Sequence, residues 1–308
     1  MGFLEKLFGK RDQAAAPPPT AEGPQSLPPA HTEEPGDRRL SLQVLFGPLE
    51  ESALDPLKFV GILRGMHASM AGAQFDHEQS GTKGILSWGP HKIEVLIRSH
   101  PLPKEFIARC IDTAYYKPEQ KEAARRHRLY VLLKHQGGEV SPWDQYAALG
   151  AAAAAMSRQG AIAITNAFAP SSVPASYFDQ LFRAPDAWTM LLNMPPAALY
   201  MGFMKFRIPR SEKVWMRTLG GHLLGMPDLA RLAESDKGNQ TFNLLNAVLL
   251  NSHRTGQKIS TGGTMQLGPH VLAKFSLPGP RDFALEAPGE MFVVEPEETG
   301  AQPATASV

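Results

Sequence analysis

The chain has one cysteine among 308 residues, and this scarcity excludes several kinds of protein. Cys110 alone can form neither an internal disulfide nor a cysteine-ligated metal cluster. A disulfide-stabilised secreted scaffold is therefore excluded, and a reducing compartment is the expected environment. We expect a cytoplasmic protein.

Long apolar runs are missing as well. No stretch reaches the roughly 18 consecutive apolar residues that can span a bilayer. The N-terminus also lacks the long apolar core and the small-residue cleavage site of a secretion signal. We therefore expect neither a membrane-spanning helix nor export through a cleaved signal.

Neither sign of charge dominates, since 31 Lys and Arg residues stand against 30 Asp and Glu residues. Such a balance creates no overall field that would attract phosphate backbones or acidic substrates. A dedicated nucleic-acid-binding function is therefore not expected. The hydrophobic content, by contrast, is 43%, which is enough to form a sizeable core in a chain of this length.

The two ends of the chain differ in composition from the rest. Residues 1–11 place large apolar side chains on one helical face, beside a basic edge, and predict a short amphipathic helix. The apolar residues are Phe3, Leu4, Leu7 and Phe8, and the basic ones are Lys6, Lys10 and Arg11. Two roles stay open for this helix: weak peripheral contact with the inner membrane surface, or docking on a protein. Residues 12–39 are predicted to be a disordered Pro/Ala/Glu linker, and residues 297–308 a disordered tail.

Residues 40–140 are predicted to form a ferredoxin-like half. Apolar alternation indicates strands, and a proline before a helical apolar pattern indicates the start of a helix. The expected strands are 40–46, 84–88, 91–98 and 129–133, and the expected helices start at Pro56 and Pro103. The order is βαββαβ, which is the ferredoxin-like arrangement of a four-stranded sheet with two helices on one face.

Residues 141–296 are predicted to repeat that order. Ser141 and Pro142 start a long alanine-rich helix that ends at Gly160 and joins the halves. The expected strands are 161–165, 199–208, 213–219 and 263–276, with helices at 177–182 and 241–253 and an edge strand within 283–295. The expected fold class is α+β, with two tandem ferredoxin-like α/β-sandwich halves.

Five segments of the chain carry a family resemblance. They are HRLYVLLKHQ (127–136), GAIAITNAFA (160–169), LYMGFMKFRI (199–208), WMRTLGGHLLGMPDL (215–229) and NLLNAVLLNSHRTGQKISTGGTMQL (243–267). With them the chain resembles an uncharacterised bacterial family, domain of unknown function 4261. It departs from the family at Asn166, where an aromatic residue is expected, and at Gly263, where an acidic residue is expected. The resemblance supports the fold and implies no established activity.

The best-defined candidate for a catalytic site is the connection between His222 and Asp228. These residues flank a turn at Gly225, Met226 and Pro227, which could bring the imidazole within hydrogen-bonding reach of the carboxylate. A histidine oriented by a carboxylate is the minimum unit of a general base. The alternative is structural: the glycines supply unusual backbone angles, and Asp228 caps a short helix that starts at Leu229.

Three other sequence patterns could indicate a binding site but are better explained by ordinary structural roles. His222, His253 and His270 could form a metal site, but their spacing matches no known ligand motif, so neither a metal nor a cofactor is expected. The glycines of residues 260–268 lack the lysine of a phosphate-binding loop and indicate a bend or bulge. The basic cluster Arg125, Arg126, His127 and Arg128 is typical of a solvated face.

Two functions are consistent with these features. The first is a non-enzymatic, cytoplasmic binding or accessory protein that acts through contact with an unidentified protein partner. The second is a small-molecule-binding or hydrolase-like enzyme that uses the connection between His222 and Asp228. The geometry of those two side chains is the feature that would discriminate between them.

Overall fold

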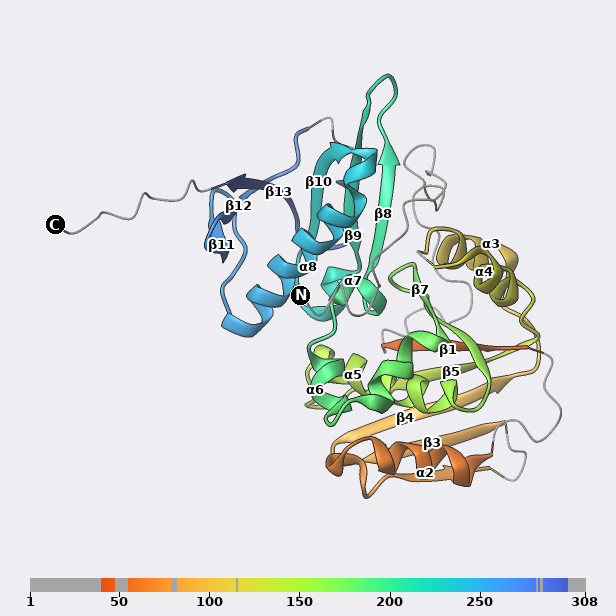
Figure 1. Cartoon of the computed structure of the whole chain (residues 1–308). Helices are drawn as coiled ribbons and strands as arrows, with labels where there is room; N and C mark the ends of the chain where they lie inside the picture. Colours follow the sequence, from red (N-terminus) through yellow and green to blue (C-terminus); the bar gives the residue numbers. More distant parts are fainter. Residues whose placement is uncertain are drawn as a thin grey trace. The chain divides into compact units, whose positions relative to one another are not determined.

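The computed structural model describes residues 40–47, 55–78, 82–114, 116–280, 282 and 285–298. It is a mixed α+β structure that divides into two compact units (Figure 1). Among these residues, the first unit contains 40–194 and 198–202, and the second contains 195–197 and everything from 203 onward. The boundary predicted between residues 140 and 141 is therefore wrong. The predicted N-terminal helix, with Phe3, Leu4, Leu7 and Phe8, and the linker 12–39 lie outside the described residues.

The first unit is built on an antiparallel sheet of seven strands in the order β2-β3-β4-β5-β1-β6-β7. The strands are β1 (Ser41–Phe46), β2 (Gln74–His77), β3 (Lys83–Trp88), β4 (His91–Arg98), β5 (Leu129–His135), β6 (Ala161–Asn166) and β7 (Ser171–Pro174). The four strands predicted before residue 135 are confirmed. The short strands β2 and β7 were not predicted.

The predicted ferredoxin-like pairing is wrong for this sheet. A ferredoxin-like half would place its first strand between its third and fourth strands, whereas here β1 lies between β5 and β6, and β4, the third predicted strand, pairs with β5. The strand predicted at 161–165 to open the second half therefore completes the first sheet. The order of elements along the chain does not determine which strands pair, so the same βαββαβ order yields a larger sheet.

Both faces of the first sheet are covered by helices. One face carries α3 (Lys104–Ile107), the π-helical turn η2 (Ala108–Asp112) and α4 (Pro118–Arg125), which bury Leu45, Tyr130 and Leu132. The other face packs against α5 (Pro142–Ser157), whose alanine block 151–155 is fully buried. Alanine side chains allow this helix to approach the strands closely. The remaining helices of this unit are α2 (Pro56–Met66), η1 (Ala68–Met70), η3 (Ala175–Arg183) and α6 (Ala187–Leu192), and α7 (Pro196–Leu199) follows them in the chain.

The second unit is built on a sheet of six strands in the order β11-β12-β13-β10-β9-β8. The strands are β8 (Gly202–Arg207), β9 (Lys213–Leu219), β10 (Asp228–Glu234), β11 (Thr264–Gly268), β12 (Val271–Ser276) and β13 (Met291–Glu298). The strand predicted at the edge is β13, and it lies in the middle, parallel to β10 and antiparallel to β12. It also includes residues 297 and 298, which were assigned to the tail.

The two faces of this sheet are covered differently. The helix α8 (Gly238–Thr255) packs on one face, where Phe242 meets Phe203 edge to face with the ring centroids 5.3 Å apart. On the other face Trp215 and Met291 are buried with Leu285, from the segment that precedes β13. The loop between β9 and β10 holds the 3-10 turn η4 (Gly221–Leu224), and η5 (Ser235–Lys237) leads into α8. None of the described helices is long and apolar enough to cross a membrane.

Candidate functional site

The carboxylate of Asp228 organises the connection between β9 and β10. It accepts hydrogen bonds from the Gly221 N–H at 3.0 Å, the Gly220 N–H at 3.3 Å and the Thr218 hydroxyl at 3.1 Å. The Thr218 hydroxyl oxygen in turn accepts from the Leu229 N–H at 2.8 Å. Burial raises the pKa of the Asp228 carboxyl, and these donors and the nearby Arg217 charge lower it only in part. Asp228 thus provides the hydrogen-bond acceptor for the backbone N–H groups of Gly220 and Gly221 in the loop.

The glycines of this connection are needed for its backbone geometry. Gly220 and Gly225 have φ angles of 97° and 67°, in the left-handed region that side chains disfavour. A Cβ atom on Gly221 would lie 2.5 Å from the carbonyl oxygen of Pro227, so no larger residue fits without movement of the backbone. The structural interpretation of these glycines is confirmed.

His222 and Asp228 do not form the predicted pair. His222 is exposed, whereas Asp228 is 1% exposed, and no hydrogen bond joins the two side chains in the described part of the chain. The helix expected to start at Leu229 is also wrong, because Asp228 and Leu229 begin β10. Asp228 therefore supports the η4 turn from the neighbouring strand and does not orient the His222 imidazole.

The proposed histidine metal site is not assembled either. Within the described residues no group of three His, Cys, Asp or Glu side chains could hold a metal ion, so His222, His253 and His270 do not converge. The glycine-rich segment 260–268 turns into β11 through Gly262, whose φ angle is 74°. It is a bend, as predicted, and leads to a strand.

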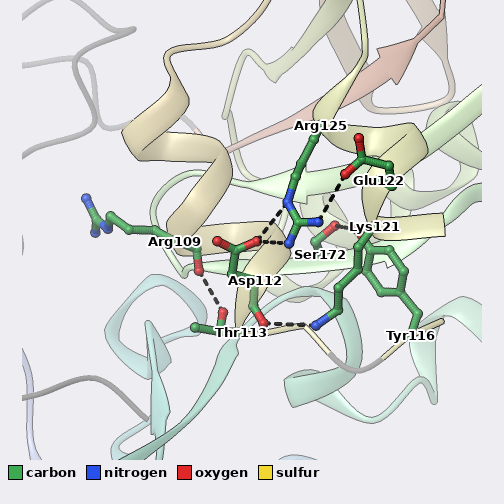
Figure 2. Close-up of polar contacts among 8 residues, drawn as sticks. All are labelled: Arg109, Asp112, Thr113, Tyr116, Lys121, Glu122, Arg125 and Ser172. Carbon is green, nitrogen blue, oxygen red and sulfur yellow. Dashed lines mark hydrogen bonds and ion pairs between the residues drawn. The ribbon is translucent and has the colours of Figure 1, made fainter. Parts of the chain in front are cut away.

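Part of the basic cluster 125–128 is engaged in contacts within the first unit, as Figure 2 shows for Arg125. Arg125 forms an ion pair with Asp112 and a weaker one with Glu122 at 3.4 Å, and Arg126 pairs with Glu122 at 2.7 Å. Next to them the Lys121 ammonium donates to the carbonyl oxygen of Asp112 at 2.9 Å. The contacts to Asp112 fasten α4 to η2, whereas Arg126 stays 78% exposed and Arg128 is exposed.

Tyr116 and Ser172 extend this cluster to the edge of the sheet. Their hydroxyl groups lie 3.0 Å apart and hydrogen-bond, which links the segment between η2 and α4 to β7 (Figure 2). Burial raises the pKa of the Tyr116 hydroxyl, which therefore stays protonated over the physiological range. The pair is a structural link between two elements.

His127 differs from its basic neighbours because it is buried and neutral. Its Nε2 atom accepts a hydrogen bond from the Leu102 N–H at 2.7 Å, and its Nδ1–H donates to the Ala124 carbonyl at 2.8 Å. Both nitrogens are thus used, and burial lowers the pKa of the imidazole. The solvated-face interpretation fails for this residue.

Sequence reasoning missed a pair of buried histidines in the first unit. His135 accepts from the Gly137 N–H through Nδ1 at 3.0 Å, so its Nε2 carries the proton and donates to Nδ1 of His91 at 3.2 Å. Burial lowers the pKa of both rings, and His91 lowers the pKa of His135 further, to about 4. The rings of Trp88 and Trp188 enclose His91, with centroids 5.2 and 5.5 Å away. No local motif indicates this pair, because the two histidines are 44 positions apart.

Three of the sheet edges in the described chain are protected against pairing with another strand. At one end of the first sheet, β2 has only four residues and carries an exposed Asp76, and short charged strands resist pairing. At the other end β7 stops at Pro174 and packs against η2. In the second sheet, Gln257 and Asn251 donate side-chain amides to the outer strand β11, at the carbonyls of Thr264 and Gln266.

The fourth edge, formed by β8, is of a different kind. Its strand is six residues long, Gly202–Arg207, and β9 is its hydrogen-bonded neighbour on one side only. Figure 1 shows β8 and β9 as the two strands of a hairpin, with β8 on the side away from β10. In the part of the chain that the structure describes, no strand covers the outer backbone of β8. We call this feature the β8 edge.

Apolar and cationic side chains both lie along the β8 edge. Phe206 and Ile208 are partly exposed and pack beside Trp215, whose cross-strand partner Leu232 is 39% exposed. The tip of the hairpin adds exposed charges, three cations against one carboxylate: Arg207, Arg210, Lys213 and Glu212. An open strand with apolar and charged neighbours is the arrangement that binds an extended segment.

The comparisons with known proteins return no match: no protein-family model, no curated protein and no solved structure corresponds to the chain. The resemblance to domain of unknown function 4261 therefore stays a prediction.

Proposed function

We propose that this protein is a non-enzymatic binding or accessory protein of the cytoplasm, and that it binds a protein partner at the β8 edge. The observation that supports the proposal is the contrast among the edges: three are short, covered or capped, and β8 is none of these. An exposed strand offers unpaired N–H and C=O groups in register, which an extended segment of another protein can complete.

The neighbouring apolar surface supports the same proposal. Backbone hydrogen bonds provide affinity in strand addition, but side-chain contacts select the partner. Phe206 and Ile208 provide such contacts on one face of the β8 edge. Each large apolar side chain gains about 1.5 to 3 kcal/mol when it is fully buried, so the partly exposed surface here leaves free energy to be gained on binding.

A display library of random extended peptides, selected against the full chain, tests this function. Hydrogen exchange with a selected peptide should slow at the amides of 203–207 and stay unchanged at β11. The matched control is the same peptide with N-methylated amides, which cannot pair with a strand and should not bind. Protection confined to another surface, or undiminished binding of the N-methylated peptide, would overturn the proposal.

A further inference from the structure

The alternation of side chains along β8 gives its two faces opposite character. Phe206 and Ile208 pack on the Trp215 side of the sheet, and Met204 shares their face because side chains in a strand alternate. Lys205 and Arg207 project to the other side, where the Lys205 ammonium donates to the carbonyl oxygen of Ser235 at 2.8 Å. The strand is therefore apolar on its Trp215 face, and its other face carries Lys205 and Arg207 beside Phe203, which packs against Phe242 of α8.

An added strand would continue this pattern, because residues opposite each other in neighbouring strands share a face. Apolar side chains of the added strand would lie against Phe206 and Ile208, and its other side chains would lie next to Lys205 and Arg207. Opposite charges across strands are favourable, whereas like charges directly opposite are unfavourable. Arg210 and Lys213 at the exposed tip add positive charge beyond the strand, against the one carboxylate of Glu212 there.

We propose, on the basis of the function above, that the partner is an extended protein segment of alternating apolar and acidic residues, bound as a strand along β8. Charge complementarity selects this occupant over a second copy of the chain, since pairing β8 with itself would set Lys205 and Arg207 against the same cations. It also makes binding sensitive to salt, because exposed ion pairs are screened.

Three fluorescent peptides test the partner chemistry on the full chain by anisotropy. The first alternates valine and glutamate, the second replaces glutamate with lysine, and the third is the first with N-methylated amides. The acidic peptide should bind, the basic one at least about tenfold more weakly, and the N-methylated one not measurably. Raising the salt concentration should weaken the binding of the acidic peptide. The basic peptide should still bind no more tightly than the acidic one.

A pair of charge variants locates the effect. Arg207→Glu should weaken the affinity for the acidic peptide about fivefold or more, because it replaces attraction between residue 207 and the peptide glutamates with repulsion. Lys258→Glu makes the same change of charge at an exposed position away from the hairpin and should leave the affinity unchanged. Circular dichroism of both variants should match the parent, since neither residue is buried.

The outcomes separate this inference from the proposed function. Equal binding of acidic and basic peptides, with exchange protection at β8, would overturn the partner chemistry and keep the binding function. If no peptide protects the β8 amides from exchange, both the partner chemistry and the binding function at the β8 edge are overturned. A single-stranded oligonucleotide that displaces the acidic peptide and binds more tightly would also overturn the inference, since phosphate and not a peptide carboxylate would then be the anion selected.

Discussion

At the scale of single residues, one of the two side chains predicted for a catalytic site, Asp228, holds the loop structure together. Asp228 is buried with three donors aimed at its carboxylate, and His222 is exposed and apart from it. A buried carboxylate that accepts backbone N–H groups is a structural anchor, because removing it leaves those donors unsatisfied.

Asp228→Ala should therefore destabilise the protein by about 3 kcal/mol, since the Gly220 and Gly221 amides and the Thr218 hydroxyl lose a buried acceptor. His222→Ala should change stability by less than about 0.5 kcal/mol, as expected for an exposed side chain. Urea unfolding of the two variants beside the parent measures both effects. Equal losses would contradict the assignment of Asp228 as the anchor.

The buried histidines make stability depend on pH. The pKa of His135 is about 4 in the folded protein and about 6.5 in the unfolded chain, and the pKa values of His91 and His127 are lowered as well. Between these values the unfolded chain binds more protons, so stability is fully present above about pH 6.5 and falls toward pH 4. His135 alone should account for a loss of about 3 kcal/mol across that window.

Free energies of unfolding measured between pH 7 and pH 4 test this expectation. A His135→Gln variant, which cannot take up the proton, should show a shallower decrease than the parent over the same range. Identical slopes for the two proteins would contradict the assignment of the pH dependence to this ring.

At the scale of elements, the ends of helices follow local rules. Ser141 precedes α5, and its hydroxyl oxygen accepts from the Asp144 N–H at 3.1 Å. Asp55 does the same for α2 with the Leu57 N–H at 2.9 Å. A side-chain oxygen at this position satisfies an amide that the helix itself leaves unpaired.

Ser141→Ala should lower stability by about 1 kcal/mol, because it removes that acceptor from the start of α5. Ser141→Asp retains an acceptor at the same position and should recover most of the loss. Thermal and urea unfolding of both variants measure the difference. An aspartate variant as unstable as the alanine variant would show that the cap is not the cause.

At the scale of the whole molecule, residues 40–298 contain the two sheets and the helices that cover them. The sequence before residue 38 is rich in Pro, Ala and Glu, a composition with too few apolar residues for a core. The stability of the chain should therefore come from the two units alone.

Deletion of residues 1–37 should leave the thermal midpoint within about 1 °C of the full chain, because that segment contributes no core. Differential scanning calorimetry of the two chains measures it. A decrease of several degrees would show that the segment is an integral part of the fold.

The sequence by itself determined the local structure of this protein. Helix starts at Asp55 and Ser141, the strand β5 at residues 129–135 and the glycine bend at 260–268 all follow from short-range rules: caps, apolar periodicity and the backbone freedom of glycine. Each of these signals lies within a few residues of the feature it determines, so no distant contact is needed to recognise it.

Only the tertiary structure decided which elements became neighbours. Apolar alternation shows that a strand is buried but does not name its partner, so the pairing of β1 with β6 and the central place of β13 were not predictable. The same limit applies to the sites: His91 meets His135 across 44 positions, and the Asp228 carboxylate accepts from the Gly221 amide. The open β8 edge is likewise a property of the whole sheet, since a strand is an edge only because no other strand folds beside it.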